Sequence, residues 1–263
     1  MHPVDRFRFL HQGSEAFVLV NVWDGASALL AQQAGAQALG TSSASLAWSL
    51  GWPDGQQLPW AELKAAVVRL LRVARVPLSV DIEAGYGSEP EAVAARVREL
   101  AELGVAGINI EDGLAPAEQL AAKLRAIRQR LGKRPLFLNA RCDSFLLAVG
   151  EPSAREGLAL ARAQAYAAAG ADGVFLPGLA DLATAGRLAQ AVPAALNLMW
   201  LPGLPPRQAL PAAGVHRLSL GPASFLGAYS ALAEQLRGWC ALGQPPEGWQ
   251  PRPDYAGWQA LCA

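Results

Sequence analysis

The feature that most constrains the fold is a pattern that recurs along the 263-residue chain. A helix-like stretch ends in glycine, and a short apolar run follows within a few residues, as at Gly35, Gly104, Gly170 and Gly214. Glycine suits the left-handed cap that closes a helix. Ala- and Leu-rich stretches with helical periodicity separate the apolar runs. Strict alternation of strand and helix predicts a parallel sheet with right-handed crossovers.

Eight apolar runs qualify as strands. They are Val18–Val22, Ala38–Thr41, Leu78–Asp81, Gly107–Ile110, Leu136–Asn139, Gly173–Leu176, Leu196–Met199 and Arg217–Leu220. Eight strand–helix units favour an α/β fold that closes as a (β/α)8 TIM-type barrel, a single domain with its sites at the C-terminal ends of the strands. A doubly wound open sheet is the alternative, although no G-x-G-x-x-G motif follows a strand.

The two ends of the chain lie outside the repeat. Residues 1–240 are predicted to form the barrel with an N-terminal arm, and residues 241–263 a C-terminal arm rich in Pro and Trp. The predicted helix Pro222–Trp239 carries apolar side chains over much of its surface. It can pack on another subunit or on its own barrel, and the residues alone leave both open.

Composition excludes several classes of function. The net charge is +0 and no basic stripe is present, so nucleic acid is not expected as a partner. No apolar run reaches the ~20 residues that span a bilayer, so no membrane is expected either. The N-terminus lacks the apolar core of a signal peptide, and three widely spaced cysteines give neither a disulfide framework nor zinc spacing. A cytoplasmic location is the expectation.

Acidic residues gather where predicted strands end. Asp81 ends one predicted strand, and Glu83, two residues later, shares its face if the strand continues. Glu111 ends the next strand, and Asp54 lies in the loop after the second. Four carboxylates on one rim would raise one another's pKa, and a divalent cation removes this conflict. Oxygen ligands without His or Cys favour Mg2+, or Mn2+, over Zn2+. The alternative is that some of these acids cap helices or pair with arginine.

Other strand ends carry candidate ligand-binding groups. The turn at Ser42, Ser43 and Ala44 can present consecutive backbone N–H groups to a carboxylate, although an ordinary serine-rich turn would have the same sequence. Arg141 ends the fifth strand, and its fork suits a carboxylate; the alternative is a salt bridge to Glu111 or Asp143. Asn197, in the seventh strand, could donate to a substrate.

Six segments in order resemble the isocitrate lyase/phosphoenolpyruvate mutase superfamily. They are NVWDGASALLAQQAG, TSSASLAWSLGWPDG, VDIEAGYG, GINIEDG, LNARCDSF and GADGVFLPG. The resemblance implies a (β/α)8 barrel, Mg2+, and substrates that are 2-oxo acids or are cleaved to give them. It also implies a homotetramer, or a dimer, often with the eighth helix exchanged between subunits.

The resemblance also implies roles for single residues. Asp81 resembles the direct Mg2+ ligand, and Asp54, Glu83 and Glu111 resemble ligands that act through water. Ser42, Ser43 and Ala44 resemble the segment that holds the substrate carboxylate and 2-oxo oxygen. Arg141 and Asn197 match substrate-binding positions. The candidate catalytic residues are then Arg141, Glu111 and Ser43.

The loop after Glu111 departs from the superfamily pattern. Its sequence, DGLAPAEQLAAK, lacks the K-K/R-C-G-H loop of the isocitrate and methylisocitrate lyases. Ala117 and Gln119 fall near the Lys and Asn of the phosphonopyruvate enzymes, which weakens a P–C bond reaction. The sequence favours Mg2+-dependent carbon–carbon bond cleavage or decarboxylation of 2-oxo acids (oxaloacetate, pyruvate or 2-oxoglutarate type) or malate-type precursors, through a metal-stabilised enolate. The rival from another class is a non-catalytic or regulatory protein that binds such an acid.

Overall fold

A computed structural model describes the chain apart from residues 149, 246–247, 249 and 251. Eight parallel strands close a barrel in sequence order, from β1 beside β2 round to β8 beside β1. They are β1 (Phe17–Val22), β2 (Leu39–Thr41), β3 (Leu78–Asp81), β4 (Gly107–Glu111), β5 (Phe137–Arg141), β6 (Gly173–Leu176), β7 (Ala195–Met199) and β8 (Val215–Ser219). Each predicted strand is present with its ends displaced by no more than two residues. The closed barrel is confirmed, and the open sheet was the wrong alternative.

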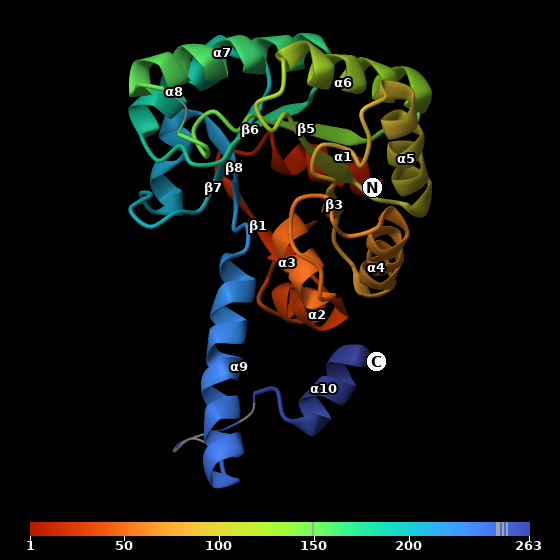
Figure 1. Cartoon of the computed structure of the whole chain (residues 1–263), viewed down its shortest axis with the longest axis vertical. Helices are drawn as coiled ribbons and strands as arrows, with labels where there is room; N and C mark the ends of the chain where they lie inside the picture. The colour runs from red at the N-terminus through yellow and green to blue at the C-terminus, as the bar shows by residue number, and fades with distance from the viewer. Residues whose placement is uncertain (149, 246–247, 249, 251) are drawn as a thin grey trace.

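Helices connect the strands and cover the outside of the barrel (Figure 1). They are α1 (Pro3–Leu10), α2 (Gly25–Gln33), α3 (Ser43–Ser49), α4 (Trp60–Val73), α5 (Pro90–Leu103), α6 (Ala117–Leu131), α7 (Pro152–Ala168), α8 (Leu182–Ala191), α9 (Ala223–Leu242) and α10 (Tyr255–Cys262), with 3-10 turns η1 (Arg207–Ala209) and η2 (Pro211–Ala213). Helix α5 ends at Gly104 with φ of 99°, the left-handed cap that the sequence pattern predicts. Within the described residues, no helix is long and apolar enough to cross a membrane.

The interior of the barrel changes character along its axis. At the N-terminal end, α1 places Phe7 against Phe17 and Phe137, with ring centroids 6.0 and 5.3 Å apart. Above this aromatic layer lie polar side chains from the middles of the strands. Asn109 of β4 stands opposite Asn139 of β5 in the parallel register, so both project into the same layer. The C-terminal mouth carries the ionisable groups.

Helix α9 departs from the usual barrel arrangement. It extends away from the barrel, and α10 lies beyond α2 rather than on the strands (Figure 1). Leu226, Leu232 and Leu236 of α9 are 51%, 42% and 50% exposed. Helix α9 lies almost wholly within residues 1–240, which the sequence assigns to the barrel, whereas α10 lies within the predicted arm of residues 241–263.

Candidate active site

A cavity of about 200 Å³ opens at the C-terminal mouth of the barrel. Its polar wall comes mostly from the early strands and the loops after them: Asn21, Ser42, Ser43, Asp54, Asp81 and Asn109. Arg141 stands at the end of β5, where the wall changes character. Beyond it the wall is largely apolar and comes from β6, β7 and the loops after β5 and β8: Leu146, Phe175, Met199 and Pro222. The cavity can therefore hold a small acid with an anionic end and an uncharged end.

Asp81 is the most buried acid of the cavity wall. It ends β3, its backbone N–H donates to Thr41 Oγ1 at 2.8 Å, and its Oδ1 accepts from the Glu83 N–H at 3.0 Å. Burial raises the pKa of Asp81, and the charges of Asp54 and Asp143 add to the rise, while Arg141 opposes it. A positive group beside Asp81 would stabilise its ionised form.

Glu83 does not share a strand face with Asp81, which corrects the prediction. Strand β3 ends at Asp81, and the backbone of Glu83 adopts a left-handed φ of 49°. Its carboxylate accepts from the Gln56 N–H at 2.5 Å and from the Tyr86 hydroxyl at 3.2 Å, and it does not line the cavity. Burial, and next the charge of Asp81, raise the pKa of Glu83 to about 7. The two acids thus interact electrostatically although their geometry differs from that of a strand.

Glu111 and Arg141 form an ion pair at 2.8 Å. The register of β4 and β5 sets the two residues directly opposite each other, which explains the contact. Arg141 Nε also donates to Asp143 Oδ1 at 2.6 Å. The salt-bridge alternative for Arg141 is therefore present, yet the side chain still lines the cavity. Burial raises the pKa of Glu111, and Arg141 opposes the rise.

The carboxylates at the mouth of the barrel have the negative charge and the oxygen donors that a hard cation prefers. Within the described part of the chain, no three His, Cys, Asp or Glu side chains are close enough to enclose a metal ion by themselves. Asp81 and Asp54 nevertheless line one cavity, which Glu83 and Glu111 do not line, and the charges of Asp81 and Asp54 both raise the pKa of Glu83. Oxygen donors with like-charge repulsion fit Mg2+ or Mn2+ better than Zn2+. Asp81 and Asp54 would hold such an ion, with Glu83 and Glu111 completing the acidic surroundings.

The Ser42–Ala44 segment lies at the start of α3, on the cavity wall. Ser42 Oγ accepts from the Ser45 N–H at 3.3 Å, so its side chain caps the helix. The N–H groups of Ser43 and Ala44 donate to no acceptor among the described residues. These two amides are therefore available to an anionic ligand.

The predicted position Asn197, and also Cys142 and His216, have surroundings that are typical of structural residues. Asn197 is 1% exposed inside the barrel, accepts from Ser219 Oγ at 3.2 Å and does not line the cavity. Burial raises the pKa of the Cys142 thiol to about 11, which fits a packing role. His216 is the second residue of β8, at the end of the barrel opposite the mouth.

Two polar residues on the floor of the cavity are not among the site residues that the sequence predicts. Asn109 and Ser219 line the cavity, although neither lies in a loop or at an acidic strand end. A polar residue inside an otherwise apolar strand, such as Asn109 in GINIE, is the sequence pattern that indicates such a position. Such a residue faces the barrel interior, where it needs a polar partner.

Asp112 anchors the loop after β4. It is 5% exposed, and its Oδ2 accepts from Arg162 Nη1 at 2.8 Å and from the Tyr166 hydroxyl at 2.7 Å. Its Oδ1 accepts from the N–H groups of Leu114 and Asp143 at 3.1 and 3.2 Å. With four donors on one carboxylate, the short loop is held against α7 and does not extend over the cavity as a lid.

Known proteins give a consistent assignment. The profile of the phosphoenolpyruvate phosphomutase family matches residues 7–239. An uncharacterised protein of Mycobacterium tuberculosis is 38% identical over 237 residues, 88% of this chain and 87% of the relative. Oxaloacetate decarboxylase of Chromohalobacter salexigens is 33% identical over 88% of this chain and 83% of its own. 2-Methylisocitrate lyase of Bacillus subtilis is 35% identical over 65% of this chain and 58% of its own.

Solved structures share the fold. A candidate phosphonomutase from Burkholderia cenocepacia J2315 superposes with a TM-score of 0.85 at 38% identity, covering 89% of this chain and 99% of the other. Oxaloacetate acetylhydrolase in complex with its product oxalate superposes with a TM-score of 0.85 at 25% identity, covering 100% and 95%. The relatives with named activities include lyases and decarboxylases, and this chain is an enzyme of that kind. It belongs to the phosphoenolpyruvate phosphomutase family, within the isocitrate lyase/phosphoenolpyruvate mutase superfamily.

Proposed function

We propose that the chain is a Mg2+-dependent decarboxylase or carbon–carbon lyase that acts on a 2-oxo acid of the oxaloacetate type or on a malate-type precursor. The observation that supports this proposal is one cavity whose lining includes the acids Asp54 and Asp81, the Ser43–Ala44 segment and Arg141. The oxaloacetate decarboxylase relatives and the oxalate bound to oxaloacetate acetylhydrolase support the same ligand class.

Different residues of the cavity would bind different parts of the substrate. The amides of Ser43 and Ala44 donate to the substrate carboxylate, and Arg141 orients it through its planar fork. Glu111 and Asp143 hold that fork in place through their ion pairs with Arg141. A cation held by Asp81 and Asp54 would supply Lewis-acid stabilisation of the negative charge that develops on the 2-oxo oxygen.

Of the candidate reactions, decarboxylation needs the fewest catalytic groups in this site. The second carboxylate of oxaloacetate would lie toward Leu146, Phe175 and Met199, where the described cavity wall offers it no cation. An apolar surrounding disfavours a carboxylate and accepts neutral CO2. The remaining enolate takes a proton from water. Cleavage of a malate-type acid would need a proton donor and acceptor among side chains, which the anchored loop after β4 does not bring to the cavity.

The test is an assay of the purified protein with Mg2+ against oxaloacetate, 2-alkylmalates and phosphonopyruvate. The wild-type protein should release pyruvate from oxaloacetate faster than the Asp81→Asn variant does. The variant serves as the control for spontaneous decarboxylation. Turnover of phosphonopyruvate alone would overturn the proposal in favour of P–C bond chemistry. Thermal stabilisation by oxalate without turnover of any compound would instead support a binding protein, since a ligand of the folded state raises stability.

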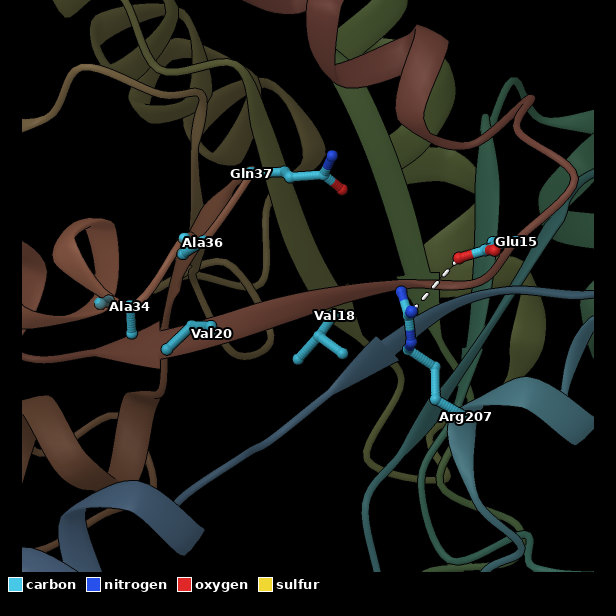
Figure 2. Close-up of a pocket in the computed structure, with 9 residues that line it drawn as sticks. Glu15, Val18, Val20, Ala34, Ala36, Gln37 and Arg207 are labelled. Carbon is cyan, nitrogen blue, oxygen red and sulfur yellow. Dashed lines mark ion pairs between the residues drawn. The ribbon is translucent and has the colours of Figure 1, made fainter.

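We also propose that α9 packs on a second copy of the chain in a homodimer or homotetramer. A groove runs along the outer face of β1 between Val18, Val20, Ala34 and the Glu15–Arg207 ion pair, and the two valines are only half-buried (Figure 2). In a closed barrel this face needs a helix to cover its valines. Helix α9, with its exposed leucines, extends away from it (Figure 1).

Light scattering at micromolar protein tests this assembly. The wild type should have the mass of at least a dimer, and a double variant Leu232→Asp, Leu236→Asp should shift it toward the monomer. Val68→Asp on α4, which is 48% exposed, is the matched control and should leave the mass unchanged. A monomeric wild type would contradict the proposal.

A further inference from the structure

Arg217 is a buried cation below the cavity. It is 0% exposed on β8, its Nε donates to Ser219 Oγ at 3.1 Å, and its Nη2 donates to Asn109 Oδ1 at 3.2 Å. Among the described residues Arg217 forms no ion pair, and its Nη1 has no hydrogen-bond partner there. The ring of Phe7 lies beneath, 5.9 Å from the guanidinium carbon. Burial of an arginine without a paired acid is costly, so a function at this position would explain why it is there.

The contacts of Arg217 fix the orientation of the Asn109 amide. Asn109 Oδ1 accepts from Arg217 Nη2 and also from Asn139 Nδ2 at 2.9 Å. A guanidinium only donates hydrogen bonds, so a reversed amide would set the Asn109 NH2 against two donors. The oxygen of Asn109 therefore points down to Arg217, and its NH2 group lies on the other side.

That NH2 group is free for a ligand. Asn109 lines the cavity together with Asp81 and Arg141. Its Nδ2 donates to no acceptor among the described residues, and it is not one of the orphaned atoms sealed from solvent, unlike Asn197 Nδ2. It therefore has access to the cavity. Beside the acids of the wall, such a donor is a place where an anionic oxygen can lie.

We propose that Asn109 donates through Nδ2 to an oxygen of the ligand's 2-oxo carboxylate group, and that Arg217 is the positioning residue that keeps this donor turned toward the cavity. This inference rests on the proposed ligand class. Arg217 touches no substrate in this scheme and acts through Asn109. Because the donor is set before binding, it costs no reorganisation when charge develops on the 2-oxo oxygen.

The first test is Asn109→Asp, with oxalate as the probe at saturating Mg2+. One oxygen of the new carboxylate can still accept from Arg217 and Asn139, so the melting temperature should be unchanged or higher. The other oxygen faces the cavity without a proton, so the oxalate dissociation constant from calorimetry should rise at least about tenfold, the effect expected for a lost charge-assisted hydrogen bond. Asn197→Asp places the same charge near Arg217 but outside the cavity wall, and should change the constant less than about threefold.

A second pair of variants tests the positioning role. Arg217→Met releases the Asn109 amide and should weaken oxalate about as much as Asn109→Asp, while Arg217→Lys keeps a donor and should recover part of the affinity. If Arg217→Met does not fold, the oxalate affinity of Asn109→Asp still tests whether Asn109 donates to the ligand. Wild-type affinity in Asn109→Asp would refute this inference alone. A wild type that binds no oxalate would refute it together with the proposed function.

Discussion

The two ends of this barrel are built from opposite kinds of interaction. At the N-terminal end, α1 closes the barrel with Phe7, His11 and Phe137 in direct ring contact; the rings of His11 and Phe137 stack at 4.0 Å. At the C-terminal mouth, buried acids lie near one another with Arg141 as their cationic neighbour, and Glu83 adopts a left-handed backbone. The closed end gains stability from apolar contact, whereas the mouth retains groups that a ligand would satisfy better than the protein does.

The polar layer between the two ends links them. Arg217 contacts Phe7 below and Asn109 above, so one side chain spans from the aromatic layer to the cavity floor. A residue that contacts only the aromatic end should affect stability alone, and one that contacts only the cavity should affect ligand binding alone. A residue that contacts both, such as Arg217, should affect both properties. Variants chosen from each end should therefore change one property and leave the other.

Asp81→Asn should have the largest effect on binding. It removes the buried negative charge of the cavity wall while its oxygen can still accept from the Glu83 N–H. Mg2+-dependent oxalate affinity should fall on the order of 1,000-fold, about 4 kcal/mol. The melting temperature should not fall, because a desolvated carboxylate is lost. Calorimetry and thermal unfolding measure the two effects, and retained affinity would remove the metal assignment.

Phe7→Ala should have the reverse profile at the closed end. Phe7 is 0% exposed, and truncating a buried phenylalanine costs about 3–5 kcal/mol. Denaturant unfolding should show this loss. If the variant is assayed while folded, its affinity for oxalate should stay within a few-fold of wild type. A large loss of affinity would show that α1 controls the mouth through Arg217.

Arg141→Lys should have an intermediate effect. An ammonium cannot serve Glu111, Asp143 and a ligand carboxylate with the planar fork of arginine, so oxalate should bind about tenfold more weakly. Arg128→Lys is the matched control, because Arg128 donates to the Leu136 carbonyl at 2.9 Å and pairs with Asp172, away from the cavity. Equal affinities in wild type and Arg141→Lys would count against a binding role.

The sequence was informative where local pattern decides structure. The strand Leu78–Asp81 was predicted at its observed bounds because its apolar run ends in an acid. Glu83 leaves the strand face that the pattern allows, because its backbone is left-handed and its carboxylate accepts from the N–H of Gln56, in a loop 27 residues earlier. Asn109 and Arg217 were missed because they approach each other only when β4 and β8 face across a closed barrel. Pattern predicts elements, while long-range contacts decide which side chains meet.

The smallest expected effect is a dependence of folding stability on pH, caused by His11 at the N-terminal end of the barrel. Burial lowers the pKa of His11 from 6.5 to about 3, so the folded protein keeps this histidine neutral where the unfolded chain protonates it. The folded state then binds fewer protons, and stability falls as pH drops below 6.5. Between pH 7.5 and 6.0 the loss from this residue should be about 0.8 kcal/mol. His11→Asn keeps a donor for the Phe7 carbonyl but cannot titrate. Its unfolding free energy, measured in denaturant, should fall less over this range than that of the wild type. An equal fall in both proteins would mean that His11 is charged in the folded state or reaches solvent.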